Sequence, residues 1–473
     1  MCEQIIEAVL KQKIITKESM KKTIIFLLMV ISAVNVNAQK SKELFNGRNL
    51  RGWKVLNGFA KYYVEDNAIV GISTKDSPST YLATKKEYTN FILEYEIKID
   101  ATLNGGVQLR SQYDPSKGKH SVFGPQVEAE TSPRGWSGGI YDQSRHKWRY
   151  TTEYNPEVKS AWDVEGWNKV KVIASGHRIA TWVNGVNITN LIEEKVEKGF
   201  IALQVHAAGV AKIGKKTRWR NIKLTEISDD YEFKTTAPVI SYLKNELSEE
   251  EKSNGWKLLW DGKTSKGWRG AKQNDFPSKG WTIKNGILAV DASGGGESEY
   301  GGDIVTIKPY GNFELVVDFK FAEGANSGIK YFVDTNLNKG QGSAIGCEFQ
   351  ILDDKKHPDA KNGTNGNRTI GSLYDLITAN AKEYIPTLQG KKYVNVGDWN
   401  RARIVVKGDF VQHYLNGCKV VEYRRNTQQW RALVGYSKYS KWPKFGEAKK
   451  GLILLQDHGD QVHFKNIKIK ELN

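Results

Sequence analysis

The segment Gly346–Asp354 carries the polar side chains best suited to chemistry in this sequence. Its residues alternate between apolar and polar, and side chains along a strand point alternately to the two faces of a sheet. The apolar series from Cys347 to Ile351 therefore belongs to a core, and Glu348 and Gln350 share the opposite face. A carboxylate and an amide on one face suit the lining of a sugar cleft. The alternative is an ordinary solvated sheet face.

His458 adds a group that acts as an acid or a base near neutral pH. It stands two residues after Gln456, and His206 stands two residues after Gln204. The chain has eight histidines, so two at matching positions favour a role in proton transfer. Metal ligation and a hydrogen-bonded structural role are the alternatives.

Other candidate side chains stand on separate segments. Tyr374 and Asp375 follow a Gly-Ser turn, and Tyr141 follows a similar turn earlier in the chain. A tyrosine hydroxyl there donates to a sugar oxygen or stabilises an enolate; the alternative is a tyrosine that joins two strands. Asn326 and Lys330, four residues apart, are further candidates for substrate binding.

Aromatic residues are candidates for stacking on sugar rings. Trp268 is included among the binding residues, and Trp53, Trp430 and Trp442 have the same potential, although core burial is the commoner fate of tryptophan. Asp353 follows the polar strand and is a further candidate for sugar binding. The carboxylates around it do not have the spacing of an EF-hand.

The composition excludes several classes of protein. The net charge is +17 with a pI of about 9.4, but the basic residues are scattered, with no nucleic-acid-binding motif. We interpret this charge as a solvated surface, or as an attraction for anionic glycans or lipid headgroups. The sequence contains no GxSxG, HExxH, P-loop or dinucleotide-binding fingerprint. No nucleic-acid partner is expected.

The candidate residues recur because the chain contains an internal duplication. The second copy has longer loops before Tyr374 and before His458, as expected around a site, although neutral loop drift has the same effect. Seven motifs recur in the same order: Leu44–Trp53 with Leu259–Trp268, Asn104–Val107 with Asn326–Ile329, Gly139–Asp142 with Ser372–Asp375, Trp167–Asn168 with Trp399–Asn400, Trp182–Gly185 with Tyr414–Gly417, Leu203–His206 with Leu455–His458, and Arg220–Leu224 with Lys465–Ile469.

The alternation of apolar and polar residues predicts an all-β fold. Asn184-Gly185 and Asn416-Gly417, each between apolar runs, predict tight hairpins. Many closely spaced strands in about 190 residues fit a two-sheet sandwich or jelly roll. We predict a first domain at 39–227, a linker at 228–254 with a short helix at 248–252, and a second domain at 255–473.

The first residues predict export. A positive start at Met20 and an apolar run over 23–34 lead to a small-residue cleavage site near Ala38, so 20–38 is predicted to be a secretory signal and 1–19 an upstream mis-start. The apolar run is too short for a typical membrane span, and the alternative to a cleaved signal is an uncleaved anchor. Cys2 precedes the cleavage site, and Cys347 and Cys418 are expected to be small buried residues, with a disulfide between them left open.

These motifs together resemble the 3-keto-disaccharide hydrolase domain family, twice over nearly the whole mature chain. The resemblance rests on Leu-Phe-Asn-Gly-x-Asn-Leu-x-Gly-Trp, Asn-Ser-Gly-Ile, Glu-x-Gln-Ile-Leu-Asp, Ser-Leu-Tyr-Asp, Trp-Asn and Leu-Gln-x-His-Gly. It implies tandem concanavalin-like jelly rolls, similar in shape to family 16 glucanases. It also implies an exported bacterial protein, periplasmic or secreted, that acts on glycosides oxidised at C3.

The resemblance implies a reaction in which a base removes the C2 proton next to the ketone and the C1 substituent leaves. For this step His458 and Glu348 are the expected proton-transfer residues. Gln350, Tyr374 and Asn326 are expected to orient the ring or stabilise the oxyanion. A divalent metal ion is a possible cofactor and is left open. Cleavage by elimination or by net hydrolysis is likewise open.

The first copy departs from the pattern. It has Gln126 where the second has Glu348, and Glu128 where the second has Gln350, so a degenerate, sugar-binding or structural role is expected. Its other counterparts of the site are His206, Tyr141 and Arg110. The leading hypothesis is a carbohydrate-cleaving enzyme. The alternatives are a non-catalytic tandem carbohydrate-binding protein and a surface scaffold.

Overall fold

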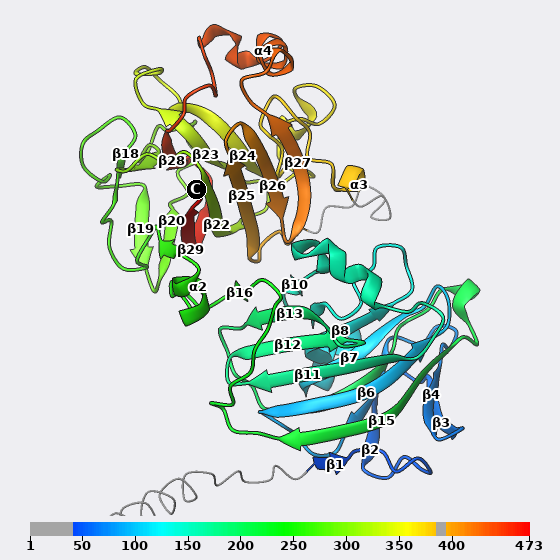
Figure 1. The fold of residues 1–473 in the computed structure, drawn as a ribbon. Coiled ribbons are helices and arrows are strands. Elements are labelled where there is room, and N and C mark those ends of the chain that lie inside the picture. Colours follow the sequence, from blue (N-terminus) through cyan, green and yellow to red (C-terminus); the bar gives the residue numbers. More distant parts are fainter. Residues whose placement is uncertain (1–40, 385–393) are drawn as a thin grey trace, which may run out of the picture. The chain divides into compact units, whose positions relative to one another are not determined.

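A computed structural model describes residues 41–384 and 394–473 of the chain, and strands make up most of its regular structure (Figure 1). The predicted all-β sandwich fold is confirmed. The predicted secretory signal lies outside the described residues. In the described part, no helix is long and apolar enough to cross a membrane.

The first half of the chain forms two antiparallel sheets. One has the strand order β16-β13-β12-β11-β6-β15-β4-β3, in which β16 alone runs parallel to its neighbour, and the other has the order β10-β9-β8-β7-β14-β5-β2. The strands are β1 (Ser41–Glu43), β2 (Trp53–Asn57), β3 (Lys61–Glu65), β4 (Ala68–Ile72), β5 (Thr80–Thr84), β6 (Phe91–Ile99), β7 (Asn104–Tyr113), β8 (Val122–Glu130), β9 (Ile140–Gln143), β10 (Lys147–Tyr150), β11 (Asn168–Ser175), β12 (Arg178–Val183), β13 (Val186–Ile192), β14 (Phe200–Val205), β15 (Lys216–Glu226) and β16 (Ile240–Ser241).

The second half repeats this plan. One sheet has the order β19-β20-β29-β22-β25-β26-β27, with β17 also paired to β29, and the other has the order β18-β21-β28-β23-β24. The strands are β17 (Trp256–Leu258), β18 (Trp268–Gly270), β19 (Trp281–Lys284), β20 (Ile287–Val290), β21 (Ile304–Thr306), β22 (Phe313–Phe321), β23 (Asn326–Asp334), β24 (Ile345–Leu352), β25 (Asn400–Lys407), β26 (Phe410–Leu415), β27 (Cys418–Arg424), β28 (Leu452–Leu455) and β29 (Val462–Glu471).

Helices are short and lie in the connections. The predicted helix in the linker is confirmed as α2, whose capping box joins Ser248 and Glu251. The helices of the described residues are α2 (Glu249–Ser253), α3 (Ala381–Tyr384), α4 (Gln428–Gly435) and the 3-10 turns η1 (Pro115–His120), η2 (Thr152–Tyr154), η3 (Pro156–Ala161), η4 (Val210–Lys212), η5 (Pro358–Lys361) and η7 (Lys438–Lys441).

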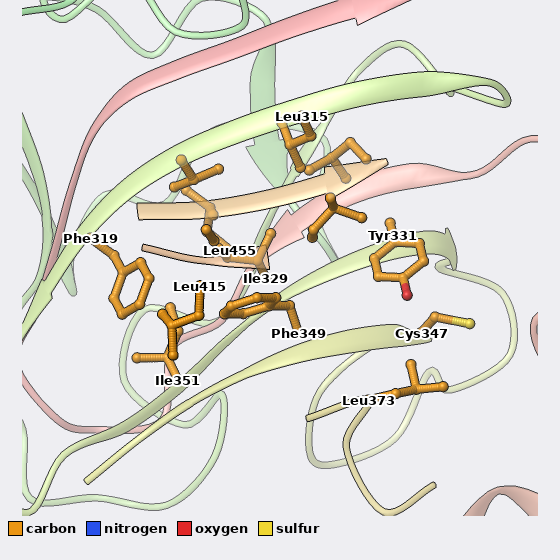
Figure 2. Close-up of a cluster of buried hydrophobic side chains, with 14 of the residues drawn as sticks. Leu315, Phe319, Ile329, Tyr331, Cys347, Phe349, Ile351, Leu373, Leu415 and Leu455 are labelled. Carbon is orange, nitrogen blue, oxygen red and sulfur yellow. The ribbon is translucent and has the colours of Figure 1, made fainter. Parts of the chain in front are cut away.

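In each half, apolar side chains from the two sheets meet in a buried core. Figure 2 shows part of the second core, where Ile329, Phe349 and Ile351 of one sheet gather with Leu315 and Leu415 of the other. The apolar alternation of the sequence is thus explained, because every second residue of these strands enters the layer between two sheets.

Cys347 and Cys418 are both buried and unpaired, so the expectation of small core residues is confirmed. The predicted hairpins also form. Asn416 and Gly417 join β26 to β27 with φ angles of 49° and 81°, the left-handed conformation that this dipeptide tolerates.

An irregularity recurs in the hairpins β7–β8 and β23–β24. The pairing register shifts between Gln108 and Gln112 in the first hairpin, and between Tyr331 and Asp334 in the second. Arg110 has a φ of 46° at this bulge, so its side chain does not follow the regular strand alternation.

Candidate functional site

The β23–β24 hairpin of the second half positions most of the candidate residues. Lys330 lies opposite Glu348 and Gly328 lies opposite Gln350 in the pairing register. Glu348 is 3% exposed and Gln350 is 1% exposed, so this face is covered by loops and is not a solvated sheet surface. A Cβ at Gly328 would clash with Glu348 Oε1, so glycine makes room for the carboxylate.

Glu348 belongs to a buried ionic cluster centred on Lys330. The Lys330 Nζ lies 3.5 Å from Glu348 Oε2 and 3.9 Å from Glu297 Oε1, and it donates to Ser343 Oγ. Ser343 Oγ donates in turn to the buried carboxylate of Asp303. One ammonium therefore faces two carboxylates directly and is connected to a third through Ser343.

Burial and charge oppose one another in this cluster. Burial raises the pKa of Glu348 above its usual value, although the ammonium groups of Lys330 and Lys438 act to lower it. Burial alone would lower the pKa of Lys330, but Glu348, Asp303 and Glu297 outweigh it and raise that pKa. The lysine therefore stays charged, and the Glu348 carboxyl takes up a proton at a higher pH than a carboxyl in water.

A chain of side-chain amides connects Glu348 with His458. Asn326 Nδ2 lies 3.2 Å from His458 Nε2, and Gln350 lies 3.2 Å from Asn326 Oδ1. Turning the Gln350 amide by 180° lets its nitrogen donate to Glu348 Oε1 at 3.3 Å and to Ser327 O at 3.0 Å. Since hydrogen-bond partners decide amide orientation, this turned form fits an ionised Glu348. His458 is half-buried, so it is the accessible end of the chain.

A second polar cluster lies on the loops that follow β24. The Tyr374 hydroxyl donates to Asp359 Oδ2 at 2.7 Å, and Arg368 bridges Asp359 and Asp375 at 2.9 and 2.7 Å. Burial and Asp359 raise the pKa of Tyr374, so its hydroxyl stays protonated. The Lys438 ammonium lies 4.1 Å from the centre of the Tyr374 ring.

Lys438 joins this loop cluster to the sheet face. Its backbone N–H donates to Asp375 Oδ2 at 2.8 Å. Its ammonium stabilises the ionised carboxylate of Glu348 and so acts to lower the pKa of that group. Backbone bonds reinforce the connection, because the Tyr374 N–H donates to the Glu348 carbonyl at 3.0 Å. The structure thus brings together Glu348, Gln350, Asn326, Lys330, His458, Tyr374 and Asp375.

Two predicted binding residues lie elsewhere. Trp268 is 3% exposed in the core, and its indole N–H donates to Leu259 O at 2.9 Å, so it cannot stack on a sugar ring. Asp353 accepts hydrogen bonds from the backbone N–H groups of Gly324, Lys355 and Lys356, which makes it a loop-shaping residue.

Several residues of the site were not predicted from the sequence. Lys438 comes from a loop with no counterpart among the repeated motifs, and Glu297 lies in a polar, glycine-rich loop. Gln456 donates to Glu297 Oε1 at 2.7 Å, and its buried Oε1 has no hydrogen-bond partner among the described residues. Its position two residues before His458 was visible in the repeated Leu-Gln-x-His motif.

A divalent metal ion is the cofactor that the sequence left open. Within residues 41–384 and 394–473, no three His, Cys, Asp or Glu side chains are grouped so as to hold a metal ion. His357 is the histidine beside His458, with ring centres 6.2 Å apart, and its Nδ1 accepts from the Asp359 backbone N–H at 3.2 Å. The described residues around His458 therefore do not form a ligand set for a divalent ion.

The β7–β8 hairpin of the first half has the same register with different residues. Gln108 lies opposite Gln126 and Gly106 lies opposite Glu128, so Gln108 takes the place of Lys330. Gln126 donates to Glu128 Oε2 at 3.1 Å, and Asn104 donates directly to Glu128 Oε1. Burial, together with the Glu130 carboxylate, raises the pKa of Glu128 to about 8.

The other first-half counterparts do not assemble as in the second half. His206 is exposed, and its Nδ1 contacts the Ala207 carbonyl at 2.6 Å. Tyr141 packs its ring against Trp148 with centres 5.2 Å apart. Arg110, at the bulge, donates to the carbonyls of Thr89 and Gly176, so it is a structural arginine and not a counterpart of Lys330.

The chain is therefore an all-β sandwich protein that carries a buried acid–base cluster on one sheet of its second half. The profile of the 3-keto-alpha-glucoside-1,2-lyase-like domain matches residues 40–225 and again 255–470. A 3-keto-disaccharide hydrolase from Bacteroides thetaiotaomicron is 39% identical over 244 residues, which is 47% of this chain and 80% of that protein.

Two solved structures are also similar to this chain. Both are described as putative glycosyl hydrolases from Parabacteroides distasonis. One is 30% identical with a TM-score of 0.41, and it covers 49% of this chain and 100% of its own. The other is 27% identical with a TM-score of 0.32, covering 46% and 99%.

This chain belongs to the 3-keto-alpha-glucoside-1,2-lyase-like domain family, which the profile matches over most of its length. The predicted family is thus confirmed, and the chain is a carbohydrate-active protein.

Proposed function

We propose that the second sandwich cleaves glycosides that carry a ketone at C3. The observation that carries this proposal is the hydrogen-bonded chain from the half-buried His458, through Asn326 and Gln350, to the buried Glu348. It gives an accessible base a buried carboxylate partner, the arrangement that orients and supports a catalytic histidine.

The substrate ketone makes this chemistry feasible. A carbonyl at C3 acidifies the proton on C2, so a histidine near neutral pH is a strong enough base to remove it. The C2–H and C1–O bonds break, a C1=C2 double bond forms, and the departing oxygen receives a proton. Addition of water across that double bond, with oxygen to C1 and a proton to C2, then gives net hydrolysis.

His458 and Glu348 have different roles in this scheme. His458 is accessible, so it takes the C2 proton and passes it to the departing oxygen. Glu348 is 3% exposed and both of its oxygens face protein partners, so it supports the imidazolium through the amides. This refines the sequence-based hypothesis that both residues transfer protons directly.

Two further residues suit the substrate. Lys438 is a lysine whose ammonium lies above the Tyr374 ring and within electrostatic reach of Glu348, and a cation there stabilises an enolate oxygen. The buried amide oxygen of Gln456 lacks a partner among the described residues, and a sugar hydroxyl supplies the donor that it needs.

We also propose that the protein is exported, to the periplasm or outside the cell. The support is the positive start at Met20, the apolar run after it and the cleavage site near Ala38. Sequencing the amino terminus of the purified mature protein tests this, because processing there predicts a chain that begins at Gln39. Retention of the uncleaved chain inside the cytoplasm contradicts it.

The test of function uses the whole processed chain and a matched pair of substrates. One substrate is a glucoside oxidised at C3 and the other is the same glucoside before oxidation. We expect release of the C1 substituent from the oxidised form and none from the parent, measured by chromatography with and without a chelator. Loss of cleavage with chelator would show that the reaction needs a metal.

A matched pair of variants separates catalysis from binding. His458→Ala is expected to lower turnover strongly and keep ligand affinity, whereas His206→Ala at the equivalent position of the first sandwich is expected to change neither. Equal affinity for both substrates with no product from either would contradict the proposal and favour a tandem carbohydrate-binding protein.

A further inference from the structure

The amide chain between Glu348 and His458 has two self-consistent orientations. Each amide side chain presents an accepting oxygen on one side and a donating N–H on the other. When one amide turns, its neighbour must therefore change from donor to acceptor or from acceptor to donor. The distances of 3.2 Å from His458 to Asn326, 3.2 Å from Asn326 to Gln350 and 3.3 Å from Gln350 to Glu348 allow both amides to turn together.

In the first orientation Glu348 is ionised. Its Oε1 accepts from the Gln350 amide nitrogen, Gln350 accepts from Asn326, and Asn326 Oδ1 accepts from His458 Nε2–H. The Ser327 carbonyl, 3.0 Å away, also accepts from Gln350 and favours this orientation. The hydrogen of a neutral His458 is then on Nε2, and Nδ1 is the basic nitrogen.

In the second orientation the Oε1 of Glu348 carries a proton and donates it to the Gln350 oxygen. Gln350 then donates to Asn326 Oδ1, and Asn326 donates to His458 Nε2. A neutral His458 must then carry its hydrogen on Nδ1 and has no basic nitrogen left for a substrate. The oxygen of Gln350 lies 3.0 Å from the Ser327 carbonyl, so this orientation requires the proton on Glu348.

We propose that Asn326 and Gln350 form a relay through which the protonation of Glu348 selects the tautomer of His458. The proposal deepens the proposed function and rests on it for its catalytic meaning. Asn326, Gln350 and Glu348 are positioning residues, because they act on the substrate through the imidazole. The ionised form of Glu348 holds His458 ready to accept a proton at Nδ1.

The surroundings of Glu348 decide which of its oxygens takes the proton. Lys330 Nζ faces Oε2 at 3.5 Å and Gln350 faces Oε1 at 3.3 Å, so protonation is directed to Oε1, the relay side. Lys438, Glu297 and His458 are the other charged or titratable groups that act on this carboxyl, with Asp303 and Tyr374 beside the same cluster. Burial raises the pKa of Glu348, so the relay changes orientation at a higher pH than that at which an ordinary carboxyl titrates.

Glu348→Gln mimics the protonated form. Lys330 attracts the oxygen of the new amide, which leaves its nitrogen to donate to Gln350. We expect His458 to change from the Nε2–H to the Nδ1–H tautomer in this variant. Selective ¹⁵N labelling of histidine and long-range ¹⁵N–¹H correlation report the tautomer without any substrate.

The sandwich contains its own tautomer standards. His413 faces the Gly371 carbonyl with Nδ1 at 3.1 Å and the Tyr331 hydroxyl with Nε2 at 2.8 Å, so it carries its hydrogen on Nδ1. Burial lowers the pKa of His413 to about 4, so it is neutral at pH 7. His357 accepts at Nδ1 and therefore carries its hydrogen on Nε2 when neutral. Both patterns are expected to persist in Glu348→Gln if the variant is folded.

A second variant separates the relay from a general disturbance. In Glu348→Gln with Gln350→Leu the relay is cut, and His458 is expected to return to the Nε2–H tautomer. An Nε2–H pattern for His458 in folded Glu348→Gln, or an Nδ1–H pattern that survives Gln350→Leu, would overturn the proposal.

The relay remains testable if Glu348→Gln does not fold. In the native chain the ring nitrogens of His458 are expected to show a titration step at the pH where the ¹³Cδ shift of Glu348 titrates. Gln350→Leu is expected to remove that step from His458, and its persistence would contradict the relay. These readouts need no substrate, so failure of the relay and failure to cleave 3-keto-glycosides are separate outcomes.

Discussion

The β7–β8 and β23–β24 hairpins have the same register, but the carboxylate and the amide are exchanged between them. The second sandwich has Glu348 opposite Lys330, whereas the first has Gln126 opposite Gln108. The first sandwich carries its carboxylate one pleat along, at Glu128. The carboxylate of Glu128 therefore lies opposite Gly106, and not opposite Gln108, which is the counterpart of Lys330.

The exchange also changes what the histidine can do. In the second sandwich Asn326 lies between Gln350 and His458, and it connects the imidazole to a carboxylate. In the first, Asn104 donates directly to Glu128, and His206 is exposed and contacts its own loop. The same strands therefore support a connected acid–base site in one half and a closed hydrogen-bond network in the other.

Removing the histidine should have the largest effect, and it should differ between the two sandwiches. We expect His458→Ala to lower kcat on a 3-keto-glucoside by about 10²–10⁴-fold, the usual contribution of a general base. His206→Ala should leave kcat unchanged, because that ring does not reach the amides of its hairpin. Steady-state kinetics of the two variants test this, and equal losses would contradict the assignment.

Transposing the second hairpin into the order of the first should have the next largest effect. The double variant Glu348→Gln with Gln350→Glu keeps the charge but places it beside Asn326 and away from Lys330. We expect kcat to fall by less than in His458→Ala, because the buried Lys330 ammonium loses its partner while the new carboxylate still reaches His458 through Asn326. Activity close to that of the native chain would show that the position of the charge does not matter.

Lys330→Gln gives the second hairpin the residue found in the first. It leaves Glu348 and Asp303 buried without their cation, a change that costs about 3–5 kcal/mol in other proteins. We expect a lower melting temperature of the second sandwich by calorimetry. The double variant with Glu348→Gln should recover part of the loss, and no recovery would argue against an ion pair.

Glu128 should make the first sandwich sensitive to pH. Its pKa is raised from 4.5 to about 8, so the folded state holds a proton that the unfolded chain releases between those values. Stability from this group is complete below about pH 4.5 and is lost as pH rises through about 8. The melting temperature should therefore fall over this window, and less so in Glu128→Gln. Parallel curves for the two proteins would contradict the raised pKa.

Much of the β structure follows from alternation. The pattern around Glu348 and Gln350 correctly predicted which side chains enter the core, and the Asn-Gly pairs correctly predicted hairpins. The repeat also gave Asn326 and His458 counterparts in the first half, at Asn104 and His206. Local periodicity determines these features, because each depends on neighbours a few residues away.

The rest depends on distant segments. Lys438 and the loops that cover Glu348 reach the site through connections without periodicity, so alternation could not show that this face is buried. Trp268 was predicted to stack on sugar and lies in the core, and Arg110 turns away at a bulge. The domain boundaries and the secretory signal stay predictions.

The proposed cleavage depends on removal of the C2 proton of a 3-keto-glycoside by the second sandwich. The direct measurement is cleavage of a 3-keto-glucoside in D₂O, with NMR of the C2 position of the released sugar and a sample without enzyme as reference. Elimination followed by addition of water predicts deuterium at C2 in step with turnover, and none above the reference with His458→Ala. Full cleavage with hydrogen retained at C2 would contradict the account.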